Sequence, residues 1–136
     1  ANVLNPTQVS LGAGLFPYEA AASLDGQYIY MSDLSAKKVV QIKIADNSVR
    51  SLQLASNAPQ GLVVSPDGSK LYVADTNADT IFVVNTNTMA LTATWNLAAG
   101  TGPIGLAINP AGSNLFVAGF YSNKLVTVNT TLGRRS

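Results

Sequence analysis

The sequence contains no cysteine and no histidine. Without cysteine, these 136 residues can form neither a disulfide nor a thiol nucleophile. Without histidine, they can form neither a histidine-based catalytic triad nor the common zinc and copper sites. Several of the most frequent catalytic and metal-binding arrangements are therefore excluded from this chain.

Charged residues are also scarce, at 11% of the sequence, and eight basic side chains nearly balance seven acidic ones. A net charge of +1 gives no electrostatic surface for nucleic acid, and the pair Arg134–Arg135 is too small to form one. No apolar run approaches the roughly 20 residues of a membrane-spanning helix, so we expect no membrane insertion. Low charge with abundant Asn and Thr is common in exported proteins. This favours an extracellular or periplasmic location, with no signal peptide visible in the chain.

The chain does contain a clear internal repeat. Three similar segments begin at Pro17, Pro59 and Pro103, which are 42 and 44 residues apart. They read PYEAAASLDGQYIYMSD, PQGLVVSPDGSKLYVAD and PIGLAINPAGSNLFVAG. A period in the low forties is typical of the four-stranded blades of a β-propeller, so the sequence predicts an all-β repeat protein.

Each period predicts four strands, which we name A to D from the innermost strand outwards. Strand A is a short apolar run, strand B is rich in aromatic and β-branched residues, and strand D is amphipathic. A tight turn such as Pro66-Asp67-Gly68 joins A to B, because Asp caps the backbone and Gly accepts a positive φ. In the central repeat the strands are expected at Leu62–Ser65, Leu71–Ala74, Thr80–Asn85 and Leu91–Leu97.

The central repeat resembles a known propeller family. The run SPDGSKLYVADTNADTIFVVNTNT at Ser65–Thr88 is similar to the YVTN-type repeat of bacterial and archaeal proteins and to the repeats of lactonase-like propellers. The likeness extends three times over nearly the whole chain. It is weaker where Leu24 replaces the turn proline and where Ala111 replaces the turn aspartate. The resemblance implies a propeller fold and says very little about function.

The predicted strands are permuted, because the first of them along the chain is a strand D. Val9–Pro17 (VSLGAGLFP) aligns with Trp95–Pro103 (WNLAAGTGP) at an offset of 86 residues. We therefore expect one domain of three blades in the order D-ABCD-ABCD-ABC. Its parts are a lone strand D and loop at 1–16, blade repeats at 17–58 and 59–102, and a third repeat at 103–136 that lacks its strand D.

Three blades are fewer than the four to eight that usually surround a propeller axis. Open arrays also leave apolar blade faces and strand edges exposed, which favours association. Two arrangements remain. Either two copies form a homodimer with six blades, each lending its first strand to the other's last blade, or the chain is a fragment of a larger propeller.

Propeller ligands usually lie near the axis, on the face formed by the D–A and B–C loops. Glu19 is a candidate binding residue there, since its equivalents are Gly61 and Gly105, which suggest a need for room near the axis. Asp33 and Asp75 follow strand B, and oxygen ligands of this kind suit Ca²⁺, the one cofactor worth considering. Each carboxylate has a simpler interpretation as a solvated or loop-capping residue.

Two further candidates are aromatic. Phe120 and Tyr121 occupy the B–C loop positions that Thr76 and Asn77 hold in the central repeat. Exposed aromatic residues often mark recognition surfaces, although packing between blades is the alternative role.

These observations favour a non-catalytic binding or scaffold module that self-assembles to complete the ring. A small polar ligand, a sugar or a protein would bind on the loop face. The alternative, implied by the resemblance, is a fragment of a lactonase-like or lyase-like propeller enzyme with its site on the ring axis. Such sites commonly use His, Arg or several acidic residues, and this chain has no His and few of the others, so we assign no catalytic residue.

Overall fold

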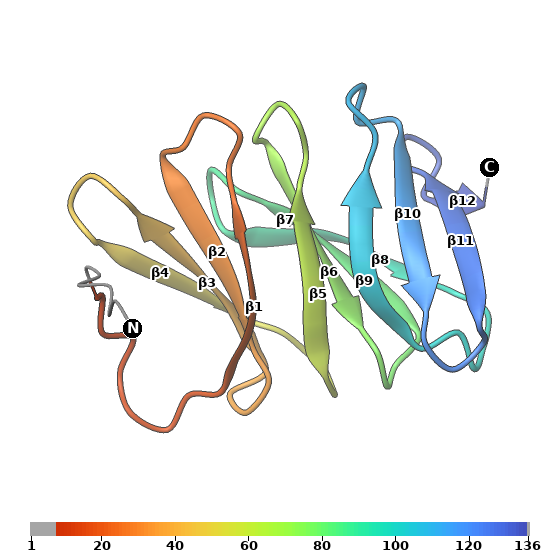
Figure 1. Cartoon of the computed structure of the whole chain (residues 1–136), viewed down its shortest axis with the longest axis horizontal. Coiled ribbons are helices and arrows are strands. Elements are labelled where there is room, and N and C mark those ends of the chain that lie inside the picture. Colours follow the sequence, from red (N-terminus) through yellow and green to blue (C-terminus); the bar gives the residue numbers. More distant parts are fainter. Residues whose placement is uncertain (1–7, 136) are drawn as a thin grey trace, which may run out of the picture.

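A computed structural model describes residues 8–135 of the chain. Within this range the chain forms twelve β-strands and no helix, and hence no helix that could cross a membrane. The strands build three four-stranded antiparallel sheets, each from one sequence repeat. Figure 1 shows the sheets standing side by side along the longest axis of the molecule. The protein is an all-β, partial β-propeller of three blades.

Each blade is a simple meander in which consecutive strands pair. Blade 1 consists of β1 (Pro17–Ala22), β2 (Tyr28–Asp33), β3 (Lys38–Lys43) and β4 (Val49–Gln53). Blade 2 consists of β5 (Pro59–Val64), β6 (Lys70–Asp75), β7 (Thr80–Asn85) and β8 (Ala90–Asn96). Blade 3 consists of β9 (Pro103–Ile108), β10 (Asn114–Gly119), β11 (Lys124–Asn129) and β12 (Arg134–Arg135).

Apolar side chains fill the two spaces between neighbouring blades. The innermost strands β1, β5 and β9 lie side by side, as Figure 1 shows. Residues alternate along each strand, so one set of side chains faces the preceding blade and the other set faces the next. The cluster between blades 1 and 2 includes Tyr30, Val39, Leu62, Leu71 and Phe82, and that between blades 2 and 3 includes Tyr72, Ile81, Leu115, Val117 and Val128.

The third blade differs from the sequence prediction in its outer strand. Arg134–Arg135 form a short β12, which pairs with Val128 and Asn129 of β11. Two residues are too few to show a strand period, so the repeat pattern did not indicate them. The lone strand D predicted at the start of the chain lies mostly outside the described residues, and residues 8–11 carry no strand.

The A–B turns have the predicted chemistry. In blade 2 the hydroxyl of Ser65 donates to Asp67 Oδ1 at 2.6 Å, and the backbone N–H of Ser69 donates to the same oxygen at 3.0 Å. These hydrogen bonds lower the pKa of Asp67 to about 2. Asp25 accepts equivalent bonds in blade 1, so both aspartates serve their turns.

Polar contacts join the outer parts of blades 1 and 2. Gln41 Nε2 donates to Tyr30 Oη at 3.0 Å and to the carbonyl of Thr86 at 2.9 Å. Arg50 donates to Gln41 Oε1 at 2.8 Å and to the carbonyl of Asn87 at 3.0 Å. Arg50 thus holds two blades together.

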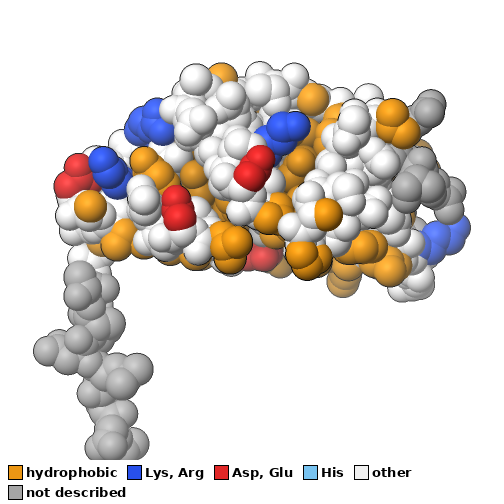
Figure 2. Space-filling view, turned by 90° about the horizontal axis from the view of Figure 1, so that it is seen from above, with side chains coloured by type: hydrophobic (Ala, Val, Ile, Leu, Met, Phe, Trp, Pro, Cys, Tyr) orange, Lys and Arg blue, Asp and Glu red, His pale blue; other side chains and the backbone are white. Residues whose placement is uncertain are grey.

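Charged side chains are sparse on the face that Figure 2 shows, where most atoms are uncharged.

Candidate functional site

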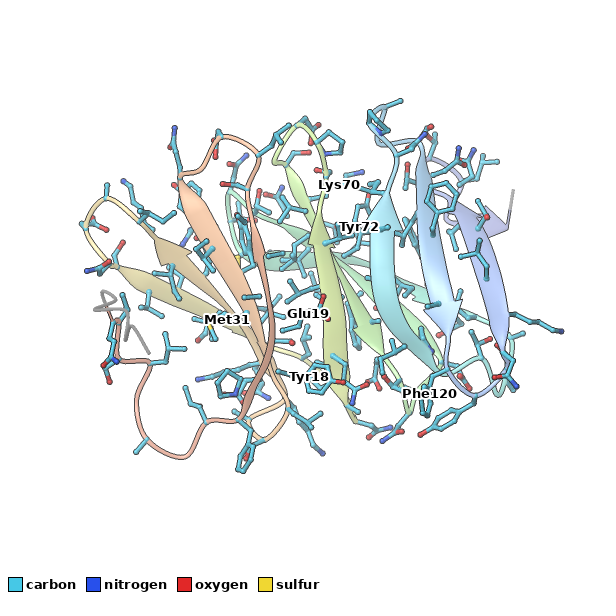
Figure 3. The ribbon with its side chains drawn as sticks, in the orientation of Figure 1. Tyr18, Glu19, Met31, Lys70, Tyr72 and Phe120 are labelled. Carbon is cyan, nitrogen blue, oxygen red and sulfur yellow. The ribbon has the colours of Figure 1, made fainter. Side chains whose placement is uncertain are left out.

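The candidate site is the loop face, which we define by the D–A and B–C loops at one end of the sheets. Tyr18 and Phe120, from the first and third blades, both lie at this end in Figure 3. The loops at this face are 12–16, 34–37, 54–58, 76–79, 97–102 and 120–123.

Glu19 belongs to the innermost strand β1, and Figure 3 shows it on the side of β1 that faces β5. It occupies an irregularity in the pairing of β1 with β2, between Pro17 and Ala20. Partial burial raises the pKa of Glu19, and a hydrogen bond with the backbone of Leu62 opposes that rise. The carboxylate therefore contacts the next blade and remains partly open to solvent.

Gly61 and Gly105, which match Glu19 in the repeat, differ in the space that is available for a side chain. A Cβ atom on Gly61 would lie 1.7 Å from the carbonyl oxygen of Ile104 in the next blade. The expected need for room is therefore confirmed at Gly61. At Gly105 the nearest atom to such a Cβ is 3.7 Å away, because blade 3 has no following blade within the described residues.

Asp75 is buried at the end of β6 and holds two loops in place. Its Oδ2 accepts the Ser56 hydroxyl and the Asn57 N–H, each at 2.7 Å. Its Oδ1 accepts backbone N–H groups of Ala58, Asn77 and Ala78, each at 3.1 Å. Both oxygens are engaged by protein donors, so the geometry of Asp75 is that of a loop clamp.

Asp33 is equally buried but is less completely bonded. Its Oδ1 accepts the N–H groups of Phe16 at 3.3 Å and Ala36 at 2.8 Å. Its Oδ2 has no hydrogen-bond partner among the described residues. A buried carboxylate oxygen without a donor is costly, so Asp33 marks a place where a loop is incompletely anchored.

The aromatic pair of the third blade is exposed on the loop face. Phe120 and Tyr121 are 62% and 58% exposed, with ring centroids 5.3 Å apart in an edge-to-face arrangement. The Tyr121 hydroxyl donates to Asn77 Oδ1 at 3.4 Å, which links the pair to the previous blade. Gly102 lies against the Tyr121 ring, where a Cβ would be 2.4 Å from Cδ2. The pair therefore offers an exposed apolar surface on a supported base.

Asp79 is a loop-face residue that the repeat comparison missed. Its two oxygens accept the N–H groups of Gly100 at 2.8 Å and Gly102 at 2.7 Å. The third repeat has Gly119 in place of the strand-end aspartate, so Asp79 anchors the loop that leads into β9 instead. The one signal in the sequence is that Asp79 is acidic, whereas the residues at the same position in the other two repeats are Lys37 and Asn123.

Within residues 8–135, no group of three or more acidic side chains lies close enough to hold a metal ion. The structure brings Tyr121 and Asn77 together and keeps Asp33 and Asp75 in separate loop networks. The arrangement can support binding through exposed rings, the Glu19 carboxylate and loop amides.

No protein-family model and no curated protein sequence matches the chain. Solved structures do match its fold. A hydrazine synthase from Kuenenia stuttgartiensis is 22% identical, with a TM-score of 0.82, over 100% of this chain and 38% of that one. Virginiamycin B lyase from Staphylococcus aureus is 17% identical, with a TM-score of 0.73, over 85% of this chain and 38% of that one. U3-55K is 13% identical, with a TM-score of 0.84, over 95% of this chain and 40% of that one.

These likenesses show a propeller-type fold and, at such identities, nothing beyond the fold. The chain spans about two fifths of the length of the proteins it resembles. The predicted propeller architecture is therefore confirmed, while the particular likeness to YVTN-type repeats stays a resemblance.

Proposed function

We propose that this chain is a non-catalytic β-propeller scaffold that assembles with a second copy of itself to complete a ring. The ring would present the loop face, with Phe120, Tyr121 and Glu19, to a small polar ligand, a sugar or a protein. Low charge supports an extracellular or periplasmic location for such a module.

The exposed end face of blade 3 carries this proposal. Val39 and Ile81 occupy matching positions on the third strands of blades 1 and 2, and both are 0% exposed because the next blade covers them. Leu125 holds the same position in blade 3 and is 71% exposed. The repeat thus places on blade 3 the kind of apolar surface that the other blades bury.

At the opposite end of the array, blade 1 exposes a position that blade 2 buries. Leu62 of β5 is buried against blade 1, whereas the matching Ala20 of β1 is exposed. The chain contains two junctions between blades. In each, the face that is exposed on blade 3 packs against the face that is exposed on blade 1. A second copy offers that same face, so two arrays of three blades can cover each other's ends. Burying one leucine side chain contributes about 1.5–3 kcal/mol.

The solution mass tests this proposal. We expect light scattering to give about 28 kDa, twice the 14.1 kDa chain. The Leu125→Glu variant should give the mass of one chain, because it places a charge on the covered face. Leu24→Glu is the matched control, since Leu24 is also an exposed leucine but lies in a turn of blade 1. A stable monomer of the unmodified chain, with well-formed strands, would refute self-assembly.

The enzymatic alternative has less support. A histidine-to-alanine variant of the S. aureus lyase is described as catalytically inactive, and this chain has no histidine. Chemistry of that kind would need residues other than these 136.

A further inference from the structure

The outer edge of β11 is only partly paired. In blade 2, β7 pairs with β8 from Thr80 through Asn85, and in blade 1, β3 pairs with β4 from Lys38 through Ile42. In blade 3, β12 pairs with Val128 and Asn129 alone. The edge at 124–127 therefore has no partner strand among residues 8–135. Unpaired strand edges are sites where another chain can add a strand.

A mainly apolar cavity of about 300 Å³ lies beside this open edge. The cavity lies between the end of β8 and the beginning of β11. Its lining includes Trp95, Leu97, Lys124, Leu125, Val126 and Gly133. The open edge provides backbone groups for pairing, and the cavity leaves room beside β11 for an added strand.

The repeat register identifies the segment that fits this edge. Arg134 and Arg135 pair with β11 as Ala90 and Leu91 pair with β7, so β12 is the beginning of a strand like β8. Residues further along β8 include Trp95, which lies opposite Ile81. Trp95 aligns with Val9, and Ile81 aligns with Leu125. Residues 8–11 thus match residues 94–97, in the part of the outer strand that the edge lacks.

We propose that residues 8–11 of one copy extend the outer strand of blade 3 in the other copy, an inference that rests on the proposed self-assembly. Val9 then lies opposite Leu125, with Ser10 opposite Lys124. Each copy donates and receives one such segment, so the exchange is reciprocal, as two-fold symmetry requires.

The end of the outer strand supports the same register. In the complete blades a leucine follows strand D, and its N–H donates to a carbonyl in the B–C loop: Leu54 to Lys37 at 3.0 Å and Leu97 to Asp79 at 2.8 Å. Lys37 and Asp79 both have positive φ, and the matching Asn123 has φ 57°. Leu11 is the matching leucine in the donated segment. Its N–H is placed to reach the carbonyl of Asn123 in the other copy.

The unpaired oxygen of Asp33 is an independent observation that points to the same exchange. In blade 2, Asp75 Oδ2 accepts the N–H of Asn57, in the loop that follows an outer strand. Leu15 matches Asn57, and it precedes the Phe16 N–H that already bonds to Asp33 Oδ1. Docking of residues 8–11 against the other copy draws residues 12–15 into the equivalent loop. The Leu15 N–H then supplies the donor that Asp33 Oδ2 lacks.

Cysteine cross-linking tests this pairing cleanly, because the chain has no native cysteine. Opposed residues of antiparallel strands have Cα atoms about 4.5–5.5 Å apart, which suits a disulfide. Val9 and Leu125 are both exposed, so Val9→Cys and Leu125→Cys should fold. We expect mild oxidation of the two single variants, mixed in equal amounts, to give a covalent dimer that neither variant gives alone. Leu132→Cys replaces Leu125→Cys in the control, since Leu132 is exposed in the same blade but out of register.

Three outcomes separate this inference from the proposed function. A dimer by light scattering that cross-links through Val9 and Leu125, but not through Val9 and Leu132, supports both. A dimer without the Val9–Leu125 cross-link overturns the strand exchange and leaves self-assembly standing. A monomer overturns both, and a segment that follows β12 in a longer chain would then be the strand that pairs with β11.

Discussion

Replacing Gly61 by alanine measures how closely neighbouring blades must approach near the axis. A Cβ on Gly61 lies 1.7 Å from the carbonyl oxygen of Ile104. Folded proteins essentially never show such contacts below 3.0 Å, so β5 and β9 must separate by at least about 1.3 Å, the difference between these values. The obstacle is backbone, which cannot rotate away as a flexible side chain can.

The expected cost follows from this geometry. Forcing extra atoms into a packed site costs about 1–3 kcal/mol. Because two strands must move apart, we expect Gly61→Ala to lose about 3 kcal/mol of unfolding free energy. At about 4 °C per kcal/mol for a chain of this size, the melting midpoint falls by about 12 °C.

Gly105→Ala is the matched control, since its added Cβ would meet nothing closer than 3.7 Å. Both glycines lie outside the positive-φ region, so backbone strain does not distinguish them. Both variants should be measured by urea unfolding in the Leu125→Glu background, so that assembly does not contribute. Gly105→Ala is expected to stay within about 0.5 kcal/mol of its parent. Equal effects of the two substitutions would refute the close approach of β5 and β9.

Three further predictions concern the carboxylates and the aromatic pair. Asp75→Asn should destabilise the fold by about 2–4 kcal/mol in urea unfolding, because the amide nitrogen cannot accept the hydrogen bonds that one oxygen loses. Asp33→Asn should cost clearly less, since one oxygen of Asp33 has no donor to lose. The depressed pKa of Asp67, about 2 against 3.8, adds stability that is present above pH 4 and disappears as pH falls through 2. Urea midpoints at pH 5 and pH 2 should therefore differ less in Asp67→Asn than in the unmodified chain. Replacing Phe120 and Tyr121 by alanine should shift the melting midpoint by less than about 2 °C. The same change should abolish binding to any neutral oligosaccharide that the unmodified chain retains on a glycan array.

The repeat period and the turn chemistry were sufficient to predict the blades. Pro66-Asp67-Gly68 and its counterparts act locally, so their structure follows from their own sequence. The crowding at Gly61 was also readable, because a glycine in a strand commonly marks a close backbone approach.

The loop networks could not be read in the same way. Asp33 and Asp75 match in the repeat, yet only Asp75 has both oxygens bonded, because the loops that reach them differ. Asp79 compensates for Gly119 from another blade, and no comparison of aligned positions pairs those two residues. Contacts between blades depend on the geometry of the array, which a repeat alignment leaves out.

The junction between copies must differ chemically from the junctions within one chain. Gln41 links Tyr30 to the backbone of Thr86 across blades 1 and 2, and Tyr72 lines the same cavity as Thr130 across blades 2 and 3. At the third junction the matching residue is Phe116, which has no hydroxyl group. The proposed ring therefore lacks a tyrosine hydroxyl at this place between copies. Apolar burial around Leu125 and the backbone hydrogen bonds of an exchanged strand must supply its stability. Deleting residues 1–11 should consequently give the mass of one chain by light scattering, even though Leu125 is left intact.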